Sequence, residues 1–131
     1  MFNSALASSL LLTAAQAANV LYVSSYSGKV TTLDLTPSCS PSCRAAGQVP
    51  TLRAISSTDG CAGSPSWLTL DHAKSTLFCI DEGLNSNKGS LSSFKTNGDG
   101  SLTRLNKVST LGGPVSGVLY GKGNNGLAVP H

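Results

Sequence analysis

Short apolar runs alternate with turn-forming residues along most of the chain, which predicts β-strands joined by hairpins. Beyond the first seventeen residues, no segment keeps a helical period for ten residues. Stretches such as Asn97-Gly98-Asp99-Gly100 and Ser27-Gly28-Lys29 mark tight turns. The pattern therefore predicts an all-β fold of antiparallel strands. The expected strands are Val20–Tyr26, Val30–Leu35, Thr51–Ser56, Ser66–Asp71, Thr76–Asp81, Ser90–Lys95, Leu102–Val108, Ser116–Leu119 and Gly126–Val129.

A block of this pattern returns after about fifty residues. Pro65-Ser66-Trp67-Leu68 is followed by Leu77-Phe78-Cys79-Ile80, and Pro114-Val115-Ser116-Gly117 is followed by Leu127-Ala128-Val129. An earlier copy of the second half is Leu21-Tyr22-Val23-Ser24. A repeat of about 40–50 residues built from short strands is typical of β-propeller blades. We therefore expect a partial β-propeller of about two and a half four-stranded antiparallel blades, with a complete blade from Ser66 to Val108.

The first predicted blade has three strands and lacks its innermost one. Blades bury their faces against their neighbours, so an unclosed ring would leave apolar faces and open strand edges exposed. We therefore expect residues 18–131 to be the N-terminal part of a longer propeller, which stops at His131 inside the third blade.

The first seventeen residues have the pattern of a secretory signal peptide. Leu6 to Ala15 is apolar, and Ala15-Gln16-Ala17 fits a small-x-small cleavage site, with the mature chain beginning at Ala18. The apolar stretch is shorter than the roughly 20 residues that span a bilayer. The sequence therefore predicts a secreted, extracellular protein with no membrane association after cleavage. A buried N-terminal helix is the alternative.

Composition narrows the range of partners. Charged residues make up 11% of the chain, and the net charge of +3 comes from lysines and arginines that are scattered singly. Disorder through high net charge is excluded. Because there is no basic run, we expect neither nucleic acid nor an anionic membrane as a partner.

Four cysteines follow the predicted signal peptide. An even count in a secreted chain favours disulfides. Of the three possible pairings, we expect Cys39–Cys43, which bracket a Ser-Pro-Ser turn in the loop Pro37–Pro50, together with Cys61–Cys79. A zinc site is the alternative. The sequence lacks a Cys-x2-Cys pair, and its histidines lie far from the cysteines, so we expect no metal.

Several of these segments resemble the lactonase family of seven-bladed β-propellers, and in particular its secreted fungal members. The segments are Leu21-Tyr22-Val23-Ser24-Ser25-Tyr26, Gly63-Ser64-Pro65-Ser66-Trp67-Leu68, Leu77-Phe78-Cys79-Ile80-Asp81-Glu82 and Gly98-Asp99-Gly100-Ser101-Leu102. The family includes bacterial 6-phosphogluconolactonases and the fungal 3-carboxy-cis,cis-muconate cyclase. The resemblance implies a small lactone or carboxylated substrate, bound at the central face without an organic cofactor.

Three proton-exchanging side chains fall at the same position of the repeat. Tyr26, Glu82 and His131 each follow the second strand of a copy. Lactone opening needs a base to activate water and a donor for the carbonyl oxygen. We therefore predict Glu82 and His131 as catalytic residues and Tyr26 as a substrate-binding hydrogen-bond donor. Each also has a simpler interpretation: Glu82 as a turn cap, His131 as a solvated loop residue and Tyr26 as a packing residue.

Two other side chains are weaker candidates. His72 is expected in a turn on the opposite face, and Trp67 is expected to pack between blades. A second hypothesis for the whole protein is a secreted propeller without catalytic activity that binds glycan or protein. A third is that this chain by itself is inactive, because it does not assemble a complete site.

Overall fold

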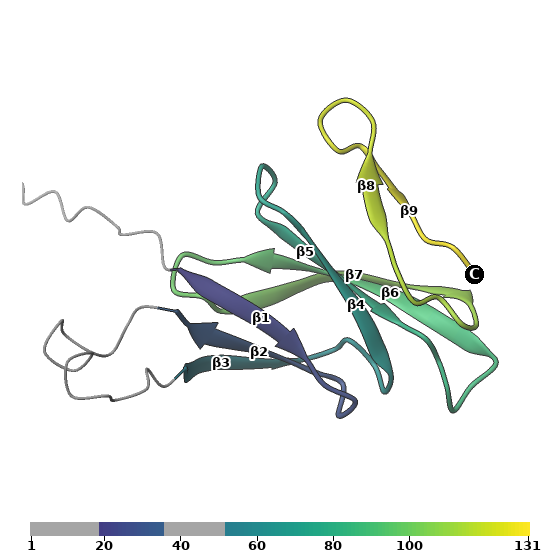
Figure 1. The fold of residues 1–131 in the computed structure, drawn as a ribbon, viewed down its shortest axis with the longest axis horizontal. Helices are drawn as coiled ribbons and strands as arrows, with labels where there is room; N and C mark the ends of the chain where they lie inside the picture. The colour runs from purple at the N-terminus through teal and green to yellow at the C-terminus, as the bar shows by residue number, and fades with distance from the viewer. Residues whose placement is uncertain (1–18, 36–51) are drawn as a thin grey trace, which may run out of the picture.

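The computed structural model describes residues 19–35 and 52–131, which form nine β-strands and no helix within those ranges (Figure 1). All pairings are antiparallel. The strands are β1 Val20–Ser24, β2 Lys29–Asp34, β3 Arg53–Asp59, β4 Pro65–Asp71, β5 Thr76–Asp81, β6 Lys88–Thr96, β7 Leu102–Leu111, β8 Val118–Tyr120 and β9 Gly126–Ala128. No helix in these residues is long and apolar enough to cross a membrane.

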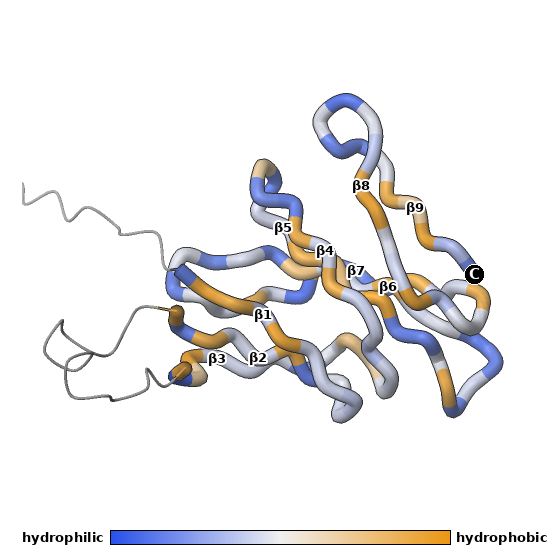
Figure 2. Tube along the Cα trace, in the orientation of Figure 1, coloured by the Kyte–Doolittle hydropathy of each residue, from blue (hydrophilic) through white to orange (hydrophobic). Residues whose placement is uncertain are grey.

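The strands form three sheets in which every strand pairs with its neighbour in sequence. Sheet 1 has the order β1-β2-β3, sheet 2 the order β4-β5-β6-β7 and sheet 3 the order β8-β9. This meander is the topology of propeller blades. The prediction of an all-β, partial β-propeller with one complete four-stranded blade is confirmed. Apolar residues concentrate in the strands, and the hairpin between β8 and β9 is hydrophilic (Figure 2).

Several strand bounds differ from the sequence-based expectation. Tyr26 lies in a turn and not in a strand, because the N–H of Ser25 already donates to the carbonyl of Lys29 at 3.1 Å. β3 extends to Asp59, since its last residues pair with the start of β2. β7 runs to Leu111, because Leu111 pairs with Lys88. In each case, cross-strand pairing decides where the strand stops.

The hydrophobic core lies between sheets 1 and 2. Val30 of β2 packs with Leu77, Cys79 and Phe94 of sheet 2, and Tyr22 of β1 lies against this cluster. Val30, Cys79 and Phe94 are fully buried. Side chains alternate between the two faces of a strand, so these positions all belong to the two faces that oppose each other.

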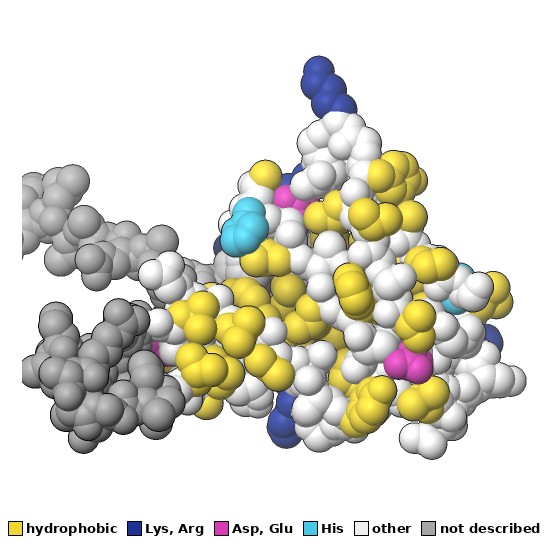
Figure 3. All heavy atoms as spheres, viewed as in Figure 1, with side chains coloured by type: hydrophobic (Ala, Val, Ile, Leu, Met, Phe, Trp, Pro, Cys, Tyr) yellow, Lys and Arg dark blue, Asp and Glu magenta, His cyan; other side chains and the backbone are white. Residues whose placement is uncertain are grey.

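The repeat places equivalent residues on equivalent faces. Leu21 and Leu77 match in the repeat, and both face away from the following sheet. Leu77 is 2% exposed because sheet 1 covers it, whereas Leu21 is 42% exposed, since no described sheet packs on that face of β1. Apolar side chains accordingly gather over β1 in the space-filling view (Figure 3). The exposure of Leu21 therefore follows from the position of sheet 1 at one end of the row of packed sheets.

A disulfide joins the segment after β3 to the middle of β5. Cys61 and Cys79 have Cα atoms 5.8 Å apart, and both side chains are fully buried. This part of the predicted cysteine pairing is confirmed. Cys39, Cys43 and the loop Pro37–Pro50 lie outside the described residues, as does the predicted signal peptide 1–17.

Candidate functional site

One end of the sheets carries the turn 25–28, the loop 82–87 and the inter-sheet links 60–64 and 112–117; we call it the strand-exit end. Backbone hydrogen bonds join these segments in a row. Cys61 N–H donates to the carbonyl of Gly28 at 3.2 Å, and Glu82 N–H donates to the carbonyl of Ser64 at 2.9 Å. Gly113 N–H then donates to the carbonyl of Glu82 at 3.0 Å. The strand-exit end is therefore one connected surface across sheets 1 and 2 and the link to sheet 3.

Glu82 occupies the centre of this row. Its backbone bonds both inter-sheet links, which fixes its position between them. The residue is partly exposed, and its carboxylate forms no ion pair with a described residue. The backbone of Glu82 thus has a structural role, while its side chain is available for contact with a ligand.

The neighbouring acid, Asp81, is committed to the fold. It is 5% exposed, and its Oδ1 accepts the backbone N–H of Ser64 at 2.8 Å and of Gly83 at 3.4 Å. Its Oδ2 accepts the hydroxyl of Ser90 at 3.0 Å. Sequence reasoning singled out Glu82 and missed Asp81. Asp81 could have been identified as an acid at the last position of a buried strand, opposite Ser90 in the paired strand.

Tyr26 and His131 are less constrained. Tyr26 is 65% exposed in the turn after β1, and His131 is exposed after β9. The repeat alignment puts all three residues in one register, but Tyr26 lies two residues beyond its strand, Glu82 one and His131 three. No hydrogen bond or ion pair joins any two of them. They share an end of the sheets without a polar interaction between them.

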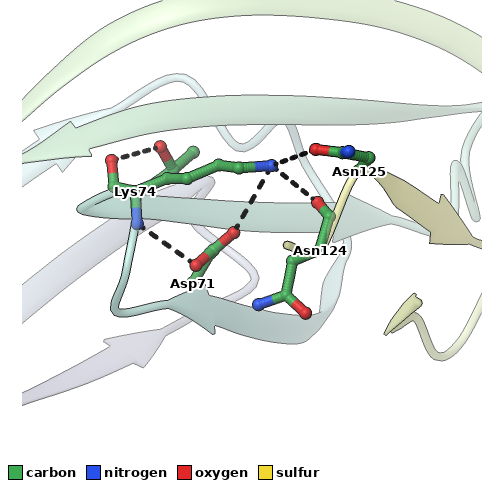
Figure 4. A network of polar contacts seen from close by, with 5 residues as sticks. Asp71, Lys74, Asn124 and Asn125 are labelled. Carbon is green, nitrogen blue, oxygen red and sulfur yellow. Dashed lines mark hydrogen bonds and ion pairs between the residues drawn. The ribbon is translucent and has the colours of Figure 1, made fainter. Parts of the chain in front are cut away.

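The end on which His131 lies follows from a network at the opposite end (Figure 4). Lys74, in the turn between β4 and β5, reaches the hairpin between β8 and β9: its Nζ donates to the carbonyl of Asn124 at 2.8 Å and to Oδ1 of Asn125 at 3.2 Å. The two hairpins therefore lie side by side. Because β9 runs away from this hairpin, the residues after it return to the strand-exit end.

The two weaker candidates are placed as expected. His72 lies in the turn between β4 and β5, at the end opposite Glu82. Trp67 bridges sheets 2 and 3, because its Nε1–H donates to the carbonyl of Gly117 at 3.1 Å. Gly117 itself packs closely: an added Cβ would come within 2.7 Å of Cδ1 of Ile80. Trp67 thus joins β4 to the link that leads into sheet 3 through a hydrogen bond, while its side chain is 45% exposed.

A pocket of about 370 Å³ opens at the end opposite Glu82, between sheets 1 and 2. Tyr22 and Leu70 line it together with His72 and Asn97. Burial raises the pKa of the Tyr22 phenol above its ordinary value, and a side-chain hydrogen bond with Thr96 acts in the opposite direction. The described residues contain no group of three or more His, Cys, Asp or Glu side chains that could hold a metal ion.

The fold and its strand-exit surface define a β-propeller with ligand-accessible polar groups at one face. The family model described as lactonase, 7-bladed β-propeller, matches residues 21–131. The chain belongs to this family. Comparisons with curated proteins and with solved structures gave no significant match.

Proposed function

We propose that this protein opens or forms a lactone ring of a small-molecule substrate at the strand-exit end. The observation that carries the proposal is the position of Glu82, whose backbone is fixed by both inter-sheet links while its carboxylate has no ion-pair partner among the described residues. Membership of the lactonase family supplies the reaction class. A fold alone does not assign a reaction, so the side chains have to be tested.

In the hydrolytic direction, Glu82 takes a proton from water as the water oxygen adds to the carbonyl carbon of the lactone. The Tyr26 hydroxyl donates a hydrogen bond to the carbonyl oxygen, where negative charge develops. When the ring C–O bond breaks, the His131 imidazolium gives its proton to the leaving alkoxide, and a hydroxy acid is released. In the ring-forming direction, a substrate carboxylate adds across a carbon–carbon double bond and a proton is placed on the neighbouring carbon.

A pH-stat assay tests this proposal, because each turnover of a lactone releases one acid. Glu82→Gln removes the proton acceptor with little change in shape and is expected to lower kcat about 10²–10⁴-fold. Asp99→Asn is the matched control, since Asp99 is an exposed acid in the turn between β6 and β7, at the opposite end. Full activity in Glu82→Gln would show that Glu82 is not catalytic. No acid release by the wild type would contradict the proposed lactonase activity itself.

A binding role without catalysis is the second candidate. It is favoured by exposed apolar side chains on the same end: Leu84 is 64% exposed in the loop 82–87 and Val115 is 55% exposed in the link 112–117. Apolar groups beside polar ones are typical of recognition surfaces. Tight binding of a substrate analogue without turnover in the pH-stat would support this role over the lactonase.

Secretion, which residues 1–17 predict, is part of the proposal. Expression in a secreting host should release a protein whose N-terminal residue is Ala18. N-terminal sequencing of the secreted material tests this, and retention of Met1 in that material would contradict it.

A further inference from the structure

A polar pocket of about 420 Å³ lies at the strand-exit end, between the link 60–64 and the part of sheet 2 nearest to this end. Its wall includes Ser64 of the link, Lys88 and Ser90 of β6, and Lys107 and Ser109 of β7. The volume is within the range of small-ligand pockets, about 300–1,000 Å³. Small-ligand pockets are mostly apolar. The described residues that line this pocket, in contrast, include no apolar side chain larger than that of Ala62. Its chemistry therefore suits a polar ligand.

The strand register puts the polar side chains on one face. Ser90 pairs with Ser109, and Ser92 pairs with Lys107, so β6 and β7 present these positions together. Side chains alternate along a strand, which places Lys88 on the same face as Ser90. Asp81 also pairs with Ser90 and completes the group from β5. Strands β6 and β7 thus direct hydroxyl and ammonium groups toward the link 60–64, and β5 adds the carboxylate of Asp81.

The loop before β6 is held in place, which positions Lys88. The N–H of Lys88 donates to Oγ of Ser86 at 3.1 Å, and that hydroxyl donates to the carbonyl of Lys88 at 3.1 Å. Ser86 N–H in turn donates to the carbonyl of Gly83 at 2.8 Å. A backbone fixed in this way lowers the entropy cost of holding a ligand between Lys88 and Lys107.

The charges of the pocket are unbalanced. Neither Lys88 nor Lys107 forms an ion pair with a described residue. The acid on the wall, Asp81, already accepts three hydrogen bonds, from Ser64, Gly83 and Ser90. Two ammonium groups against one carboxylate leave a net charge of +1 in the pocket, which favours an anion.

We propose that this pocket binds a small hydroxylated carboxylate, of the chemical class of the uronic acids. Lys88 and Lys107 pair with the carboxylate of the ligand, and the serine hydroxyls bond to its hydroxyl groups. Glu82 is not part of this wall, because Asp81 and Gly83 line the pocket and Glu82 does not. The proposal therefore does not depend on the lactonase activity.

Calorimetric titration with D-glucuronate, D-glucose and inorganic phosphate tests the pocket. D-glucose has the same ring without the carboxylate, and phosphate is an oxyanion without carbon-bound hydroxyls. D-glucuronate is expected to bind more tightly than either. Equal binding of D-glucose would overturn the role of the charge, and equal binding of phosphate would overturn the role of the hydroxyls. No binding of D-glucuronate would overturn the proposal as a whole.

Variants locate the binding. Lys88→Gln and Lys107→Gln should each weaken D-glucuronate binding about threefold or more, and the double variant more than either. Lys95→Gln is the matched control, because Lys95 is exposed on β6 outside the pocket. All three lysines are exposed, so the substitutions should leave the circular dichroism spectrum unchanged. Unchanged affinity in the Lys88→Gln/Lys107→Gln variant would place the ligand elsewhere and overturn the assignment.

Discussion

The ammonium group of Lys74 donates a 2.8 Å hydrogen bond to the carbonyl oxygen of Asn124, fifty residues further along the chain. Trp67 and Gly117 are in contact at the same separation of fifty residues. The spacing of the sequence repeat is therefore also the spacing of contacts between adjacent blades. Blades stack through equivalent positions, as expected of a repeat whose units interact only with their neighbours.

Lys74 is expected to stabilise the stacking of sheets 2 and 3. Its ammonium lies 4.0 Å from Oδ2 of Asp71, a residue that is 1% exposed and whose Oδ2 has no hydrogen-bond partner among the described residues. Lys74→Met should therefore destabilise the protein by about 1–2 kcal/mol, since a buried carboxylate oxygen loses the nearby cation. Urea unfolding measures the change, with Lys122→Met in the next hairpin as control. Equal midpoints for the two variants would contradict this role.

Trp67 is expected to contribute through its indole N–H. Trp67→Phe keeps an aromatic ring but removes the hydrogen bond to Gly117, while Thr69 still donates to that carbonyl at 3.2 Å. The expected loss is about 0.5–1.5 kcal/mol. Thermal unfolding followed by circular dichroism measures it, because Trp67 is the only tryptophan and fluorescence would be lost. Tyr120→Phe, at an exposed position of β8, should be close to neutral.

The disulfide should supply a large part of the stability of the junction between sheets 1 and 2. Cys61 and Cys79 are 18 residues apart, and closing a loop of this size stabilises a protein by about 3 kcal/mol. The double variant Cys61→Ala/Cys79→Ala is a better test than a reductant, because a reductant would also act on the predicted Cys39–Cys43 bond. A urea midpoint equal to that of the wild type would show that the bond adds nothing.

Tyr22 should lose its proton at a higher pH than an ordinary tyrosine. Burial raises the pKa of its phenol, so the folded state favours the protonated form as the pH rises past the ordinary value. Spectrophotometric titration at alkaline pH should therefore show a component above the ordinary tyrosine range, and this component should be absent in Tyr22→Phe. A single transition in the wild type, unchanged in the variant, would argue against this environment.

The linkage sign follows from the same shift. Because the pKa of Tyr22 is raised on folding, its contribution to stability is complete below the ordinary tyrosine pKa and is lost as the pH rises through the folded-state value. Tyr22→Phe should accordingly lose less stability than the wild type in the alkaline range. Urea unfolding at neutral and alkaline pH measures how far the free energy of unfolding falls with pH in the wild type and in Tyr22→Phe.

Much of the fold could be predicted from local pattern. The bounds of β5 were predicted to the residue, because Thr76–Asp81 lies between two turns and four of its six residues are buried. β3 was misplaced, since its bounds depend on pairing with β2 and its own sequence has little apolar alternation. The bond between Cys61 and Cys79 was also predicted, although spacing alone left three pairings open.

The candidate site was predicted less completely. A repeat alignment found Glu82, but it could not show that Glu82 bonds two inter-sheet links through its backbone. It also gave Tyr26, Glu82 and His131 one register, which the different strand ends of β1, β5 and β9 do not preserve. The pocket beside Asp81 was not predicted at all, because its wall combines a link and three strands that are adjacent only after the sheet has formed.

The amino-acid sequence by itself determined the class of fold, the period of the repeat and the family, because alternation of apolar and polar residues and the spacing of turns are local properties of a chain. Only the tertiary structure decided which carboxylate is buried and which is accessible, and which lysines form no ion pair within the described part of the chain. Burial and hydrogen bonding depend on the neighbours that packing brings together: Asp81 is buried and accepts three hydrogen bonds, whereas Glu82, the next residue, is partly exposed.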